Sequence, residues 1–149
     1  MPAGRKAAGP DKLSLVVYAG DVGRVHYALA LAASARAIDK PATLFFTMGA
    51  CRTLIRPAAD GAVPWRALPD GEGGTAGQLD DRFAAGGLAT FEDLLASCVA
   101  LGARFLVCEM GLKAVGLAPS DLRDDVPLEV AGIVTFLADA SPDGAMMFI

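Results

Sequence analysis

Short apolar segments alternate along this chain with longer segments of helical periodicity. The clearest apolar segments are residues 13–19 (LSLVVYA), 42–48 (ATLFFTM) and 103–110 (ARFLVCEM). Each is about one strand long and largely apolar, which is typical of strands that are buried on both faces of a parallel sheet. Two weaker strands are expected at 126–130 (VPLEV) and 145–149 (AMMFI).

The segments between these strands favour helices. Frequent alanine at helical spacing predicts a helix over residues 25–39, and an apolar stripe predicts another over 91–102, with Thr90 as its N-cap. Shorter helices are expected at 50–55, 111–117 and 131–140. This alternation predicts a single α/β domain with an open, mostly parallel, five-stranded sheet, doubly wound and flavodoxin-like.

Two parts of the chain lack such periodicity. Residues 1–11 contain Gly, Pro and charged residues, so we expect a flexible N-terminal tail ahead of an α/β domain over 12–149. Residues 57–88 are rich in Gly, Pro and Asp and are expected to be irregular and mobile. A structureless segment of that length in a compact domain is often a functional lid.

The composition is more apolar and less charged than is usual for a soluble monomer. Hydrophobic residues make up 54% of the chain and charged residues 20%, so part of the apolar surface is expected to be covered in a homo-oligomer. Met146 and Met147 are interpreted as core residues or as part of such an interface. The net charge of −4 argues against a nucleic-acid partner. No apolar run approaches the roughly 20 residues of a membrane-spanning helix.

The three cysteines, Cys51, Cys98 and Cys108, are odd in number and far apart in the sequence. They do not form the pattern of a disulfide framework, and the absence of a CxxC or Cys/His cluster predicts no metal site. A reducing, cytoplasmic location fits this cysteine usage. Residues 20–24 (GDVGR) lack the spacing of a dinucleotide-binding loop or a P-loop.

Ligands of open α/β sheets bind beyond the carboxyl ends of the strands. Residues 20–24 (GDVGR), 48–52 (MGACR) and 108–112 (CEMGL) follow the three strongest predicted strands. Asp21 is interpreted first as the cap of a helix N-terminus, with a ligand-binding role as the alternative. Gly49 is the corresponding candidate binding residue after the second strand.

Cys108 is the strongest single candidate for chemistry. It ends a strand and faces the start of a helical segment, whose unpaired N–H groups would lower the pKa of its thiol. Glu109 would oppose that effect or handle a proton, and Gly111 would let a substrate or partner approach the backbone closely. The alternative is that Cys108 is a small buried hydrophobic residue, as free cysteines often are.

The remaining candidates are weaker. Cys51 stands next to Arg52, which would stabilise a thiolate, so Cys51 is a candidate second thiol for Cys108. Cys98 lies on the apolar stripe of its predicted helix and is interpreted as a core residue. His26 is expected at the surface or near a helix start rather than in catalysis.

Four longer stretches carry a family pattern: residues 12–32 (KLSLVVYAGDVGRVHYALALA), 42–50 (ATLFFTMGA), 90–117 (TFEDLLASCVALGARFLVCEMGLKAVGL) and 129–140 (EVAGIVTFLADA). In order and spacing they resemble the DsrE/DsrF-like family of sulfur-relay and sulfurtransferase proteins, with a flavodoxin-like fold. The most specific element is a cysteine followed by Met110 and a Gly-Leu pair. By this resemblance Cys108 matches the position that carries a persulfide, and Glu109, Met110 and Gly111 flank it as candidate binding residues.

The resemblance implies a function that the residues alone leave open. It implies a sulfur carrier, or a sulfurtransferase enzyme, in which Cys108 takes persulfide sulfur from a donor protein and passes it to an acceptor protein. No cofactor is implied, and relatives form homotrimers or homohexamers. Two alternatives stay open: a non-catalytic oligomer that binds partner proteins, and a module that binds a small ligand or nucleotide at the carboxyl ends of the strands.

Overall fold

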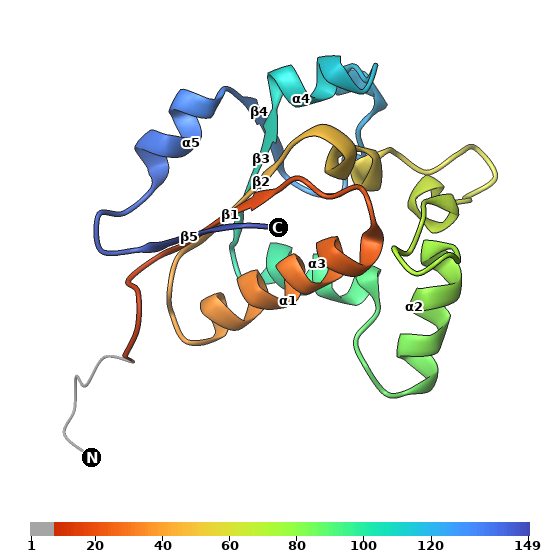
Figure 1. Ribbon diagram of the computed structural model, residues 1–149, viewed down its shortest axis with the longest axis horizontal. Coiled ribbons are helices and arrows are strands. Elements are labelled where there is room, and N and C mark those ends of the chain that lie inside the picture. Colours follow the sequence, from red (N-terminus) through yellow and green to blue (C-terminus); the bar gives the residue numbers. More distant parts are fainter. Residues whose placement is uncertain (1–7) are drawn as a thin grey trace.

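The computed structural model describes residues 8–149 and contains a central sheet of five strands (Figure 1). The strands are β1 (Leu13–Val17), β2 (Ala42–Phe46), β3 (Arg104–Cys108), β4 (Leu128–Ala131) and β5 (Ala145–Phe148). All four neighbouring pairs are parallel, and their order in the sheet is β4-β3-β2-β1-β5. The predicted five-stranded, flavodoxin-like α/β sheet is therefore confirmed.

Helices connect the strands. The α-helices are α1 (Val22–Ala37), α2 (Ala76–Ala85), α3 (Phe91–Ala100), α4 (Glu109–Ala114) and α5 (Ile133–Asp139). Short 3-10 helices are η1 (Met48–Leu54), η2 (Pro64–Ala67) and η3 (Pro119–Asp121). The helix predicted from residue 25 already begins at Val22, because Asp21 caps it, and the third strand ends two residues earlier than predicted.

The two faces of the sheet are covered unequally. One face carries the main apolar core, in which α1 and α3 pack on the strands through residues such as Leu29 and Leu95. On the other face a smaller cluster joins Phe45, Leu106 and Cys108 to Phe136 of α5. Helices on both faces make the sheet doubly wound, but α5 is short and leaves part of its face open (Figure 1).

Helix α5 is fixed to the sheet by one aromatic stack and one carboxylate. Phe136 is 1% exposed, and its ring stacks on Phe45 at 4.7 Å. Asp139 accepts a hydrogen bond from Thr43 Oγ1 at 2.6 Å and forms ion pairs with Lys12 and Arg104 at 2.8 and 2.6 Å. A helix of seven residues is not stable alone, so these contacts decide where α5 lies.

The strand order reverses at β1, although all the strands stay parallel. Strands β1 to β4 are added one after another toward one edge, and β5 then returns to pair with the free side of β1. In an open α/β sheet, such a reversal leaves a crevice at the carboxyl ends of the two strands. The fold therefore offers a ligand crevice at a place separate from the end of β3.

The prediction of an irregular segment over 57–88 is wrong where η2 and α2 form. Helix α2 begins with a capping box, in which Thr75 accepts a hydrogen bond from Gln78 N and the Gln78 side chain accepts one from Thr75 N. Trp65 of η2 is 1% exposed and packs against Phe91 at a ring distance of 4.6 Å. Of the tail predicted at 1–11, residues 1–7 lie outside the described part of the chain.

Candidate functional site

Cys108 is both the last residue of β3 and the N-cap of α4. Its Sγ accepts a hydrogen bond from the backbone N–H of Gly111 at 3.4 Å. A thiol thus takes the position that Ser, Thr or Asp usually occupies at a helix start, so one unpaired backbone donor is directed at sulfur. The predicted place of Cys108, at the carboxyl end of a buried strand and the start of a helix, is confirmed.

The Cys108 side chain borders a hollow of about 400 Å³, here called the thiol hollow. The thiol hollow is lined by Cys108, Glu109, Met110, Lys113, Gly132, Ile133 and Val134. Cys108 itself is only 1% exposed, whereas Met110 and Val134 on the rim are 54% and 80% exposed. Cys108 is therefore buried in the small cluster with Phe45, Leu106 and Phe136, and the rim of the hollow beside it is exposed and apolar.

Gly111 does not leave room for a substrate, contrary to the prediction. The residue is buried, and a Cβ placed there would overlap Thr47 Oγ1 and lie 2.6 Å from Met48 N. The chain itself fills the space, because the first turn of α4 packs against the junction of β2 and η1. Gly111 is required for packing, which also fixes the start of α4 relative to Cys108.

Glu109 and Met110 lie at the exposed start of α4. The Glu109 carboxylate is 3.4 Å from Lys113 Nζ, one turn further along the same helix. A carboxylate in the first turn of a helix also interacts favourably with the helix dipole. Glu109 is thus partly neutralised by its own helix, and Met110 contributes apolar surface beside the thiol hollow.

Cys51 does not meet the requirement for a second reactive thiol. It is fully buried in the main core, and burial, together with the nearby Cys108 sulfur, raises the pKa of its thiol to about 12. Arg52 lowers the pKa of Cys51, as predicted, but by less than burial raises it. Cys51 and Cys108 both stay free thiols.

The predictions for Cys98 and His26 have different outcomes. Cys98 is fully buried and its Sγ lies 3.3 Å from Leu29 O, so the core interpretation is confirmed. His26 is 9% exposed, not at the surface: its Nε2 lies 2.8 Å from Ala89 O and its ring packs on Phe83 at 4.5 Å. The ring holds the segment between α2 and α3 against α1.

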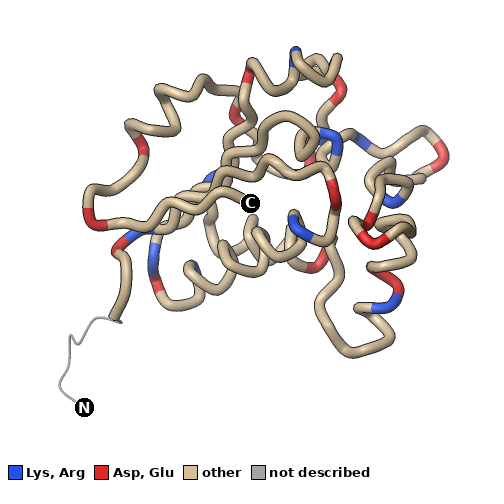
Figure 2. The backbone as a smooth tube through the Cα atoms, in the orientation of Figure 1, with Lys and Arg blue, Asp and Glu red and all other residues tan. Residues whose placement is uncertain are grey.

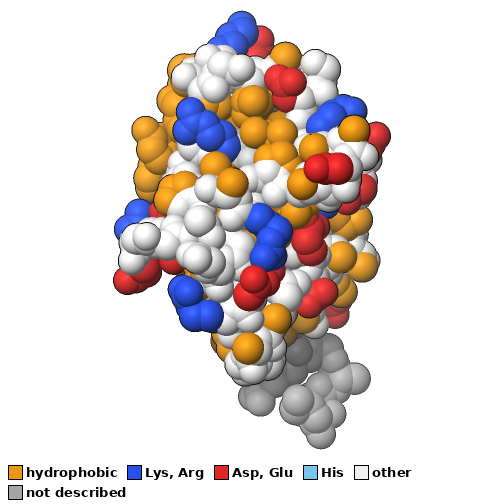
Figure 3. Space-filling model, turned by 90° about the vertical axis from the view of Figure 1, so that its right-hand side faces the viewer, with side chains coloured by type: hydrophobic (Ala, Val, Ile, Leu, Met, Phe, Trp, Pro, Cys, Tyr) orange, Lys and Arg blue, Asp and Glu red, His pale blue; other side chains and the backbone are white. Residues whose placement is uncertain are grey.

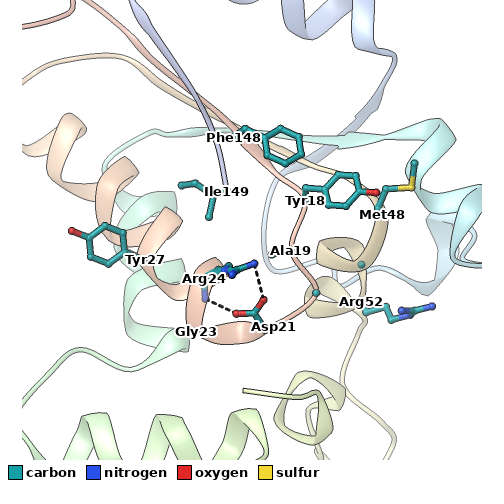
Figure 4. Close-up of a pocket in the computed structure, with 12 residues that line it drawn as sticks. Tyr18, Ala19, Asp21, Gly23, Arg24, Tyr27, Met48, Arg52, Phe148 and Ile149 are labelled. Carbon is teal, nitrogen blue, oxygen red and sulfur yellow. Dashed lines mark hydrogen bonds and ion pairs between the residues drawn. The ribbon is translucent and has the colours of Figure 1, made fainter. Parts of the chain in front are cut away.

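A larger hollow of about 890 Å³ lies at the carboxyl ends of β1 and β5 and is here called the switch-point hollow (Figure 4). It is lined by Tyr18, Ala19, Gly20, Asp21, Gly23, Arg24, Tyr27, Met48, Gly49, Arg52, Phe148 and Ile149. The sequence singled out Asp21 and Gly49 here. Arg24 and Arg52 belong to the segments 20–24 and 48–52 that the sequence placed at the strand ends, but they were not named as ligands. The aromatic members were missed, because only the sheet order brings Tyr18 and Phe148 together.

Asp21 and Gly49 both have structural roles in this hollow. Asp21 caps α1 by accepting a hydrogen bond from Arg24 N at 3.3 Å, so the preferred interpretation is confirmed. Gly49 lies against Gly20, and a Cβ on Gly49 would be 3.0 Å from Gly20 Cα. The neighbouring Met48 has a φ of +50°, a left-handed conformation that costs a non-glycine residue about 1 to 3 kcal/mol.

Apolar side chains are exposed over α5 and β5. The most exposed are Val134, Phe148, Leu137, Met146 and Ile133, at 80%, 71%, 55%, 49% and 46%. Met147 is 42% exposed as well, so the interpretation of the terminal methionines as core residues is wrong. The other interpretation, an interface between chains, stays a prediction.

The charges form no single basic surface over the described elements. Figure 2 shows Lys and Arg interspersed with Asp and Glu along the fold, and Figure 3 shows both signs mixed on the face that contains α2. Among residues 8–149, no group of three His, Cys, Asp or Glu side chains is placed to hold a metal ion. Within the same range, no helix is both long and apolar enough to cross a membrane.

No protein-family model matches the chain, and a search of curated proteins finds no significant match.

Proposed function

We propose that the protein is a sulfur carrier in which Cys108 accepts persulfide sulfur and passes it on. The observation that supports this most is the position of the Cys108 Sγ: it lies within reach of the Gly111 N–H and borders the thiol hollow. A buried cysteine with no hollow beside it would favour an inert core residue. The hollow lies beside the covered sulfur, so a donor reaches Cys108 once the side chains of the rim move.

The chemistry is exchange at sulfur and needs no external oxidant or reductant. The Cys108 thiolate attacks the outer sulfur of a donor persulfide; a new S–S bond forms at Cys108, the donor S–S bond breaks, and the donor leaves as a thiolate. Transfer onward is the reverse reaction, with an acceptor thiolate as the nucleophile. The Gly111 N–H stabilises the sulfur anion in both directions.

The rim of the thiol hollow suits a protein donor or acceptor. Met110, Ile133 and Val134 are exposed and apolar and surround the covered sulfur, so a partner that packs on them would also open the path to Cys108. A single reactive cysteine is sufficient, since Cys51 is held as a neutral thiol. A reducing, cytoplasmic location is part of this proposal, because all three thiols are free.

A second candidate function is a homo-oligomer that binds partner proteins while Cys108 is inert. The exposed apolar side chains of α5 and β5 favour it, because contiguous apolar surface on a soluble protein marks interfaces. A homotrimer or homohexamer would be detected by light scattering. Both candidate functions allow a homo-oligomer, and they differ in whether Cys108 carries sulfur.

The test of the carrier function is transfer onward. The protein is incubated with a low-molecular-weight persulfide, desalted and mixed with free cysteine as an acceptor. We expect the loaded protein to lose the mass of one sulfur atom while cysteine persulfide appears. Loaded protein that keeps its sulfur in the presence of the acceptor, or transfers it equally after Cys108→Ser, contradicts the proposal.

A further inference from the structure

The switch-point hollow lies where ligands bind in other open α/β sheets. It opens beyond the carboxyl ends of β1 and β5, where the strand order reverses (Figure 4). Its volume of about 890 Å³ is within the usual range for small-molecule sites. Cys108 is not among the residues that line it, so the hollow is independent of the proposed sulfur chemistry.

Two cations border the switch-point hollow and have weak or no partners. Arg52 is exposed and forms no hydrogen bond or ion pair with any residue in the described range 8–149. Arg24 is 71% exposed at its side chain, and its ion pair with Asp21 is long, at 3.9 Å. Both guanidinium groups can therefore bind an anion without first losing a strong internal contact.

The start of α1 does not itself bind the anion. The Asp21 carboxylate already accepts a hydrogen bond from Arg24 N there, so its negative charge occupies the helix N-terminus. An anion in the hollow is held by side chains. The hollow contains two guanidinium groups and one carboxylate, Asp21, which already caps α1. This excess of positive charge makes the hollow unsuitable for a cation.

Two aromatic rings stand on the opposite wall. Tyr18 directly follows β1 and Phe148 ends β5, and their ring centroids are 5.3 Å apart. They are 46% and 71% exposed, although large aromatic side chains are usually covered in a folded domain. Exposed rings, together with guanidinium groups that have only a weak ion pair or none, are the combination that holds an aromatic ring joined to an anionic group.

The floor of the hollow is bare backbone. Gly20 and Gly49 touch there, and the strained Met48 stands beside them. The other non-glycine residue with a positive φ in the described chain is Asp39, directly after the C-cap residue Ile38 of α1. A left-handed residue at this position is a common way to end a helix. Met48 ends no α-helix, and strained residues of this kind are frequent at ligand sites.

From these features we infer that the switch-point hollow binds a nucleoside monophosphate. Arg24 binds the phosphate, the base lies against Tyr18 and Phe148, and Arg52, whose side chain points away from Arg24 in Figure 4, turns toward the phosphate when the nucleotide binds. The site is distinct from the persulfide-carrying site, and its occupation needs no thiol.

Isothermal titration calorimetry with four probes tests this assignment. AMP and UMP present a base with a phosphate, adenosine lacks the charge, and ribose 5-phosphate lacks the ring. We expect saturable binding of AMP or UMP, and binding of adenosine and ribose 5-phosphate that is at least about tenfold weaker. The assignment is overturned if neither nucleotide saturates, or if adenosine or ribose 5-phosphate binds as tightly as the nucleotides.

Variants locate the site. Arg52→Ala should weaken nucleotide binding about tenfold or more without changing the unfolding midpoint, because Arg52 has no hydrogen bond or ion pair to lose within residues 8–149. Lys113→Ala removes an equally exposed positive charge outside the hollow and should leave binding unchanged. Cys108→Ser should bind as the native protein does, which separates this result from the sulfur test. Equal binding by Arg52→Ala and native protein would overturn the assignment.

Discussion

The Sγ of Cys108 accepts a hydrogen bond from the backbone N–H of Gly111 at 3.4 Å. This contact exists because β3 ends at Cys108 and α4 begins at the next residue, with no loop between them. The close approach of Gly111 to Thr47 and Met48 fixes where that helix starts. The environment of the thiol is thus a consequence of how tightly α4 packs against the end of β2.

Replacing Gly111 with alanine should destabilise the fold. The added Cβ would lie 2.6 Å from Met48 N, which is backbone and cannot move aside easily. We expect a loss of about 1 to 3 kcal/mol in the free energy of unfolding, measured by urea denaturation. Gly132→Ala is the matched control, since a Cβ there meets nothing within 4 Å and should cost less than about 1 kcal/mol. Equal losses for both variants would show that the packing at Gly111 is unimportant.

The attachment of α5 should depend on acid pH. Burial alone would raise the pKa of Asp139, but hydrogen bonds from Lys12, Thr43 and Arg104 outweigh it and hold the pKa below its usual value. A lowered pKa in the folded state contributes stability above the unfolded pKa of about 3.9, and this contribution is lost as the pH falls through the folded value.

The measurement is the free energy of unfolding against pH for the native protein and Asp139→Asn. We expect Asp139→Asn to be about 1 to 3 kcal/mol less stable at neutral pH, because it removes the carboxylate that pairs with Lys12 and with Arg104, which keeps only Glu129. The difference should narrow below about pH 4. Asp143→Asn, at an exposed position, is the control. A difference that stays constant down to about pH 2 would contradict the role given to the Asp139 charge.

Cys51 and Cys98 should resist alkylation in the folded protein. Burial raises the pKa of these thiols to about 12 and about 11, so at about pH 8 only roughly one in a thousand or fewer is ionised. Iodoacetamide treatment followed by peptide mass mapping should label Cys108 first. Labelling of Cys51 or Cys98 as rapid as that of Cys108 would contradict the idea that the thiol hollow makes Cys108 the most accessible of the three thiols.

The rim of the thiol hollow should control access to Cys108. Val134 is 80% exposed and lines the hollow, so Val134→Ala widens the path to a sulfur that is otherwise covered. We expect Cys108 to react several-fold faster with a disulfide reagent in this variant. Leu137→Ala removes an exposed apolar side chain of the same helix outside the lining and should leave the rate unchanged. A slower or unchanged rate in Val134→Ala would indicate that the path to the sulfur lies elsewhere.

The strands and the position of Cys108 could be predicted from sequence because they depend on local patterns. Apolar runs such as residues 42–48 mark buried strands wherever they pair, and a cysteine that ends such a run must lie at the carboxyl edge of the sheet. The capping roles of Asp21 and Thr90 were equally local, since each contacts a residue three positions ahead.

One local feature was overlooked. Helix α2 has its own capping signal in Thr75 and Gln78, but the many Gly and Pro residues around it favoured an irregular segment.

Features that depend on distant contacts could not be predicted. Gly111 suggested open space, whereas the space is filled by Thr47 and Met48, more than 60 positions earlier in the chain. The switch-point hollow needs the order of the strands, because Tyr18 and Phe148 meet only when β5 pairs with β1.

The most direct test of the account is the intact mass of the protein after incubation with a low-molecular-weight persulfide. The native chain and Cys98→Ser should each gain the mass of one sulfur atom, removable by reductant, whereas Cys108→Ser should gain none. Cys98 is the suitable control because it is a fully buried thiol away from both hollows. No addition to the native chain, or addition that survives Cys108→Ser, would contradict the carrier role and leave the partner-binding oligomer as the better account.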